Sequence, residues 1–183
     1  MKRIPVLFAV IILFASAAMA QSEPLSSDAI LKQAYEQAAK EKKNVFVIFH
    51  ASWCGWCHKM DSAMNDKSCK KFFDDNFVVR HLVVLESKDK KNLENPGAEE
   101  LRKKYHGEKS GIPLWLVFDP KGNLLGDSQI RAAGASLDSE GTNVGCPAQP
   151  EEVAHFIEIL KKTTKLNSSQ LAIIEARFSK NKS

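Results

Sequence analysis

The sequence has little net charge of one sign, and it has no long apolar segment after its first 20 residues. The whole chain carries a formal charge of +4, and removing Lys2 and Arg3 with the first 20 residues lowers this charge by two, to +2. So small an excess, spread over runs that mix basic with acidic residues, argues against nucleic acid as a partner. A membrane-spanning helix needs roughly 20 consecutive apolar residues. No later stretch supplies them, so we expect no stable membrane insertion.

The first 20 residues have the pattern of a cleaved secretory signal peptide. Lys2 and Arg3 precede an apolar run at 4–14, and Ala-Met-Ala at 18–20 has the small-x-small form of a signal-peptidase site. The apolar run is too short for a permanent span, and no cysteine near the cut provides a lipoprotein anchor there. The sequence thus predicts an exported protein, periplasmic or secreted, whose mature chain is a single domain over 21–183.

Cysteine is scarce, with four in the chain, all after the predicted cut. Cys54 and Cys57 are close together, whereas Cys69 and Cys146 are far apart. Four cysteines in an exported protein allow three full pairings. Spacing leaves three roles open for Cys69 and Cys146: a structural disulfide, buried thiols, or a relay partner for the close pair. We expect them to act independently of that pair. Because the chain lacks a second close pair of cysteines or histidines, a closed four-ligand zinc site is not expected.

The order of the apolar and amphipathic segments predicts an α/β domain with helices on both faces of a central mixed sheet. Strands are expected at 45–49, 77–85, 114–118 and 124–130, and helices at 29–42, 56–64, 69–74, 98–105, 151–162 and 170–178. Strands separated by helices imply parallel crossovers, and the last two strands imply an antiparallel hairpin. The stretch 132–149, rich in Gly, Ser and Ala, is expected to be a long loop.

The spacing of Cys54 and Cys57 at a predicted helix start has a specific chemical use. Free backbone N–H groups and the helix dipole stabilise negative charge there, which favours the thiolate of Cys54. That thiolate can attack a disulfide, and Cys57, one turn later, can resolve the mixed disulfide. A purely structural bond is less favoured, because so short a loop removes little chain entropy.

Two stretches resemble the thioredoxin superfamily, in its secreted, single-domain bacterial branch. They are Ala51-Ser52-Trp53-Cys54-Gly55-Trp56-Cys57 and Gly111-Ile112-Pro113-Leu114. The resemblance implies a thioredoxin fold with its core at about 45–162, an extra N-terminal helix and an added C-terminal helical extension at 163–183. It also implies a cis bond before Pro113. The backbone of Ile112 and Pro113 would then face the cysteine pair and bind the substrate chain.

The resemblance further implies a thiol–disulfide oxidoreductase that acts on protein thiols and disulfides, with a redox partner protein and no cofactor. A monomer is expected. Trp53 and Trp56 border the pair and would help to bind substrate, although Trp53 is expected to pack on the domain more than Trp56 does. Trp56 and Ile48 stand where thioredoxin itself has proline and a buried aspartate. The direction of the reaction and the proton acceptor for Cys57 are therefore open, with His81 and Glu86 as candidates for the acceptor.

Two other functions fit parts of the same sequence. The stretch from Cys54 to His58 also satisfies the C-x-x-C-H pattern of c-type haem attachment, which a Soret band would reveal. A non-catalytic binding module could instead use the surface of Trp56 and Pro113, with a pair that stays oxidised at strongly reducing potentials. The buried-strand pattern at 45–49 and the downstream Ile-Pro favour the redox function over haem.

Overall fold

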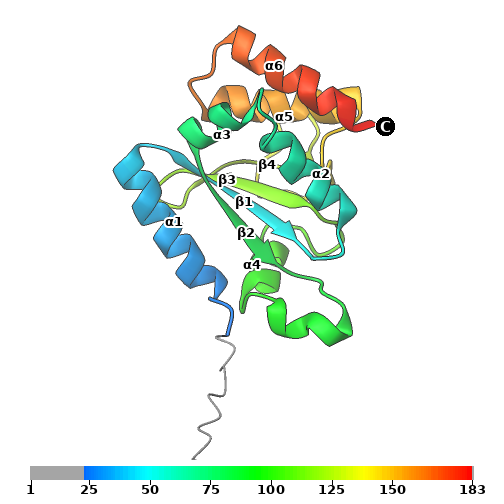
Figure 1. The fold of residues 1–183 in the computed structure, drawn as a ribbon. Coiled ribbons are helices and arrows are strands. Elements are labelled where there is room, and N and C mark those ends of the chain that lie inside the picture. Colours follow the sequence, from blue (N-terminus) through cyan, green and yellow to red (C-terminus); the bar gives the residue numbers. More distant parts are fainter. Residues whose placement is uncertain (1–22, 183) are drawn as a thin grey trace, which may run out of the picture.

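The computed structural model describes residues 23–182, so the signal peptide expected at 1–20 lies outside the described residues. A four-stranded mixed sheet forms the centre of the fold, in the order β2-β1-β3-β4 (Figure 1). β1 is parallel to β2 and antiparallel to β3, and β3 is antiparallel to β4. The strands are β1 (Asn44–His50), β2 (Phe77–Val83), β3 (Leu114–Phe118) and β4 (Leu124–Asp127).

Helices cover both faces of this sheet because β1 and β3 are apolar on both sides. In β1, Val45, Val47 and Phe49 face one layer of helices and Phe46 and Ile48 face the other, as the period of two dictates. The first layer holds α1 (Ser27–Glu41) and α4 (Ala98–Lys104). The second holds α2 (Gly55–Met64), α3 (Lys70–Asn76), α5 (Pro150–Thr163) and α6 (Ser168–Phe178). Two short 3₁₀ helices, η1 (Lys88–Leu93) and η2 (Ser179–Lys182), are also present.

This architecture confirms the predicted thioredoxin fold, with an additional helix before the sheet and another at the C-terminal end. The N-terminal helix begins at Ser27, two residues before the predicted start, because the Ser26 hydroxyl caps it by accepting a hydrogen bond of 3.2 Å from the N–H of Ala29. α6 lies beside α5, and Phe178 is fully buried in the second core. Among residues 23–182, no helix has both the length and the apolar character that crossing a membrane requires.

The direction of β3 differs from the predicted parallel crossovers. β3 runs antiparallel to β1, with Val45 opposite Phe118 and Phe49 opposite Leu114. The α4 helix has seven residues and is about 10 Å long, whereas a seven-residue strand such as β2 spans about 23 Å. Because α4 is too short to carry the chain back along the sheet, β3 starts at the edge where β2 ends.

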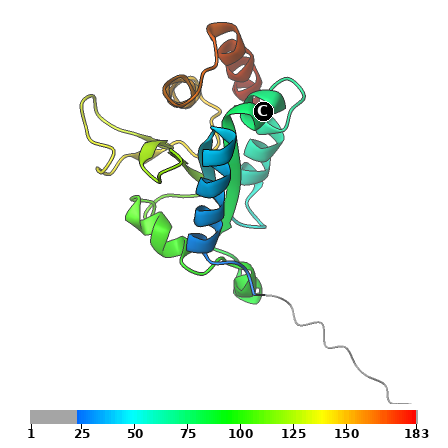
Figure 2. The same ribbon diagram turned by 90° about the vertical axis from the view of Figure 1, so that its left-hand side faces the viewer.

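The predicted strand at 124–130 is divided in two. β4 ends at Asp127, and β5 (Gln129–Ile130) pairs instead with β6 (Thr142–Asn143), inside the stretch predicted as a loop. Continuing the β3–β4 register would place Ile130 opposite Pro113, which has no N–H for the ladder. The chain therefore leaves the sheet at Ser128. The connection that follows projects from the body of the molecule, as the yellow segment of Figure 2 shows.

Candidate active site

The cysteine pair lies at the start of α2, where the fold delivers it from the end of β1. Cys54 is the N-cap residue, and its Sγ accepts a hydrogen bond of 3.1 Å from the backbone N–H of Cys57. The two sulfurs form a disulfide with a Cα–Cα separation of 5.3 Å. Cys54 is 3% exposed and Cys57 is fully buried. A negative charge on Cys54 would thus be stabilised by an N–H group and by the helix dipole.

The Ile112-Pro113 segment lies directly against this pair, as the resemblance implied. The peptide bond before Pro113 is cis, and the carbonyl oxygen of Ile112 is 3.5 Å from Sγ of Cys54. Ile112 also packs on the small apolar cluster of Ala51, Cys54 and Cys57. Two segments 58 residues apart in the sequence therefore meet at the reactive sulfur.

Both tryptophans beside the pair are exposed. Trp56 is 50% exposed, and the Nζ of Lys59 lies 4.7 Å from its ring centroid. Trp53 is 59% exposed, although its Nε1–H donates a hydrogen bond of 2.8 Å to the carbonyl of Leu85. The expectation that Trp53 packs more than Trp56 is therefore wrong: only its polar edge is fixed, and its ring faces solvent.

A groove of about 310 Å³ adjoins the disulfide on the side of Pro113. Its walls are Trp56, the segments 111–113 and 143–146, and the start of α5. The sequence indicated the first two of these walls. It did not indicate residues 143–146, which fall in the stretch predicted as a long loop and carry no local motif.

The two predicted proton acceptors make their hydrogen bonds elsewhere. Glu86 is buried and accepts from the N–H and the hydroxyl of Ser52, at 2.5 and 2.9 Å. Burial alone would raise the pKa of Glu86, but these hydrogen bonds outweigh it and hold the pKa below its usual value. His81 Nε2 lies 2.8 Å from Asp61 Oδ1. Neither residue is in hydrogen-bond contact with Sγ of Cys57. Because Glu86 binds Ser52, its role in this structure is to fix the loop before Cys54.

His50 is the last residue of β1 and lies at this end of the sheet. It follows Ile48 by two positions on β1, so both side chains are on the α2 face. Its ring centroid is 4.8 Å from that of His81. Burial lowers the pKa of His50, and the neighbouring His81 lowers it further. A neutral imidazole is thereby favoured close to the active-site helix.

Cys69 and Cys146 are separate buried thiols in this structure, not a disulfide. Burial raises the pKa of the Cys69 thiol, and it raises the pKa of Cys146 to about 12. Thiols held in the protonated form are poor nucleophiles. Cys146 lines the groove, where the amide of Asn181 lies 3.4 Å from its Sγ. These environments agree with the expectation that both cysteines act independently of the redox pair.

Haem attachment would use His58 and both sulfurs of the pair, and in this structure all three have other contacts. Its Nε2 lies 3.0 Å from the carbonyl of Ser52, so the ring is engaged with its own loop. Haem attachment would also use both sulfurs of the pair, which here are bonded to each other. Within the part of the chain that the structure describes, no three His, Cys, Asp or Glu side chains cluster as metal ligands.

Comparisons with known proteins agree with this geometry. The profile of the thioredoxin-like family matches residues 28–120, which is half of the chain. No curated protein sequence matches significantly.

Several solved structures are similar at low identity. A disulphide isomerase from Xylella fastidiosa is 21% identical, over 65% of this chain and 80% of that one, with a TM-score of 0.44. A DsbH oxidoreductase is 20% identical, over 85% and 95% of the two chains, with a TM-score of 0.43. The oxidised C-terminal domain of DsbD from Neisseria meningitidis is 23% identical, over 57% and 84%, with a TM-score of 0.39. These likenesses are too distant to indicate a substrate or a partner.

The family match therefore carries the assignment, together with the cysteine pair. It spans β1, the disulfide at the start of α2, and the cis bond before Pro113. The chain belongs to the thioredoxin-like family and is a thiol–disulfide oxidoreductase.

Proposed function

We propose that the protein is an exported enzyme that exchanges dithiols and disulfides with protein substrates through Cys54 and Cys57. One juxtaposition carries this proposal. Sγ of Cys54 is 3.1 Å from the N–H of Cys57 and 3.5 Å from the carbonyl of Ile112. A nucleophile, a group that stabilises its charge and a stretch of backbone able to hold a substrate chain thus meet at one atom.

We give the two cysteines different steps, and their burial supports this choice, since Cys54 is 3% exposed and Cys57 is fully buried. In the reduced enzyme, the thiolate of Cys54 attacks one sulfur of a substrate disulfide, which forms a mixed disulfide and releases the substrate's other sulfur as a thiolate. Cys57, which is fully buried, attacks Sγ of Cys54, and its proton passes to the substrate sulfur that is released. This step closes the enzyme disulfide and releases the substrate as a dithiol. Oxidation of a substrate dithiol is the same sequence in reverse.

The groove beside the pair suits an extended polypeptide. In the part of the chain that is described, neither the N–H nor the C=O of Ile112 is hydrogen-bonded to another backbone group. Such free groups can pair with a substrate chain as a neighbouring strand would. Trp56, half exposed at the edge of the groove, adds apolar contact area.

The protein should catalyse reduction of a protein disulfide when a small dithiol supplies the electrons. With excess dithiothreitol, we expect catalytic amounts of the protein to shorten the lag before reduced insulin chains precipitate. Insulin with dithiothreitol alone is the control, and a protein that leaves this lag unchanged would overturn the proposed function. The reduction potential of the pair then gives the direction, since about −270 mV indicates a reductase and about −120 mV an oxidant.

Export has a separate test. The proposal predicts that the protein recovered from outside the cytoplasm of an expressing bacterium begins at Gln21, after Ala20. N-terminal sequencing or intact mass measures this directly. A variant with arginine in place of Ala18 and Ala20 should remain unprocessed. Retention of the intact chain in the cytoplasm would contradict export and leave the redox chemistry unaffected.

A further inference from the structure

One amide side chain outside the redox pair ties together the segment that faces Cys54. Asn143, at the end of β6, donates from Nδ2 to the carbonyl of Gly111 at 2.9 Å and to the carbonyl of Pro113 at 3.2 Å. Its Oδ1 accepts from the N–H of Gly145 at 3.2 Å. Because only the oxygen can accept from an N–H, this third contact fixes which way the amide points.

The two carbonyls that Asn143 binds flank Ile112 on either side. These two hydrogen bonds use the polar groups of the neighbouring residues and leave the N–H and C=O of Ile112 without a backbone partner among residues 23–182. The Ile112 carbonyl lies 3.5 Å from Sγ of Cys54. Asn143 thus holds both neighbours of the residue whose carbonyl faces the reactive sulfur.

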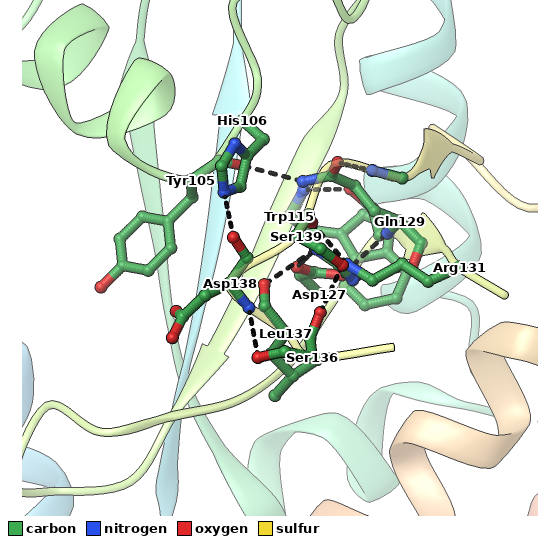
Figure 3. A network of polar contacts seen from close by, with 12 residues as sticks. Tyr105, His106, Trp115, Asp127, Gln129, Arg131, Ser136, Leu137, Asp138 and Ser139 are labelled. Carbon is green, nitrogen blue, oxygen red and sulfur yellow. Dashed lines mark hydrogen bonds and ion pairs between the residues drawn. The ribbon is translucent and has the colours of Figure 1, made fainter. Parts of the chain in front are cut away.

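The position of Asn143 is in turn fixed by the body of the protein. Asn143 pairs with Gln129 across the two-stranded sheet, and the next residue, Val144, donates to the carbonyl of Ser128 at 2.8 Å. The Gln129 side chain also donates to the carbonyl of Tyr105 and accepts from the N–H of Gly141, at 2.8 and 3.1 Å (Figure 3). Although the long connection projects from the fold, the part that reaches Pro113 is anchored at both ends.

We propose that Asn143 is a positioning residue for substrate binding. It holds the Ile112-Pro113 segment next to Sγ of Cys54. An extended substrate chain can then pair with Ile112 and present its disulfide to that sulfur. The inference rests on the proposed function, since it concerns how the same site holds its protein substrate. It assigns a binding role to a connection that carries no recognisable motif.

The test separates substrate binding from the reactivity of the pair. Asn143→Asp keeps the shape of the side chain but replaces the Nδ2 donor by a carboxylate oxygen, which faces the carbonyls of Gly111 and Pro113. Asn143→Ala removes the side chain beyond Cβ. With two hydrogen bonds lost, we expect KM for insulin to rise roughly tenfold. The value of kcat, and the rate at which dithiothreitol reduces the Cys54–Cys57 disulfide, should keep their wild-type values, because a small dithiol needs no strand pairing.

Thr142→Ala is the matched control, because Thr142 is an exposed neighbour on the same strand, and its KM should equal that of the wild type. An unchanged KM in both Asn143 variants of an active enzyme would overturn the inference and leave the proposed function intact. An equal fall in insulin turnover and in reaction with dithiothreitol would also overturn it, since that result indicates general disruption of the site. A wild-type protein inactive on insulin would instead remove the proposed function on which the inference rests.

Discussion

Replacing Cys54 by serine should reduce insulin turnover to the rate measured with dithiothreitol alone. Sγ of Cys54 is 3.5 Å from the carbonyl of Ile112, which lines the groove, and 3.1 Å from the N–H of Cys57. A serine hydroxyl stays protonated at neutral pH and forms no mixed disulfide, so no first step remains. Undiminished turnover in Cys54→Ser would sink the assignment of the nucleophile.

Replacing Cys57 by serine should give a different and diagnostic result. The first attack still occurs, but no thiolate is left to resolve the mixed disulfide. The variant should therefore accumulate covalently bound to its substrate, visible as an adduct by non-reducing electrophoresis and lost on reduction. Cys69→Ala is the matched control, because that thiol is buried away from the groove and should neither trap substrate nor lose turnover. Trapping by Cys54→Ser instead would reverse the two roles.

The features of the site that the sequence predicted are those encoded over a few neighbouring residues. The apolar run of β1, the helix start at Cys54 and the Ile-Pro before β3 each follow from local pattern. The direction of β3 did not follow from local pattern. A helix between two strands is compatible with either direction, and only a comparison of the helix length with the strand length decides between them. The break at Ser128 depends on Pro113. This proline would lie opposite Ile130 if the pairing of β3 with β4 continued, and that position is defined only once the strands have paired.

The polar contacts of the site were less predictable for the same physical reason. Asn143 contacts carbonyls about 30 residues away, and a single asparagine in a stretch rich in small residues gives no signal of that contact. His81 and Glu86 were near enough in the sequence to be considered as acceptors. Folding gives both of them other partners, Asp61 and Ser52. Pairing of polar side chains is thus decided by tertiary packing, which local spacing does not encode.

A large effect on stability is expected at the base of the connection that carries Asn143. Asp127 and Arg131 form a bidentate ion pair with distances of 2.8 and 2.7 Å, and their side chains are 1% and 7% exposed. Arg131 also donates to the carbonyls of Leu137 and Ser139, which closes the projecting segment on itself (Figure 3). One buried guanidinium thus holds both the end of β4 and the connection beyond it.

Replacing Arg131 by methionine should lower the free energy of unfolding by about 3–5 kcal/mol, because it leaves the buried carboxylate of Asp127 without its cation. That is a large share of the roughly 5–15 kcal/mol that stabilises a typical domain. Urea denaturation followed by circular dichroism measures the loss. Lys109→Met is the matched control, since its pair with Glu140 is exposed and 3.5 Å long and should contribute at most about 1 kcal/mol.

The double variant Asp127→Asn/Arg131→Met distinguishes a charge left unpaired from a side chain merely lost. If the cost comes from the orphaned carboxylate, neutralising Asp127 should recover part of the stability lost in Arg131→Met alone. If the cost came from lost packing of the arginine stem, the second change would recover nothing. A loss in Arg131→Met no larger than in Lys109→Met would contradict both accounts. The connection would then be held by its other contacts, among them the backbone pairing with Gln129 and Ser128 and the contact of His106 with the carbonyl of Asp138.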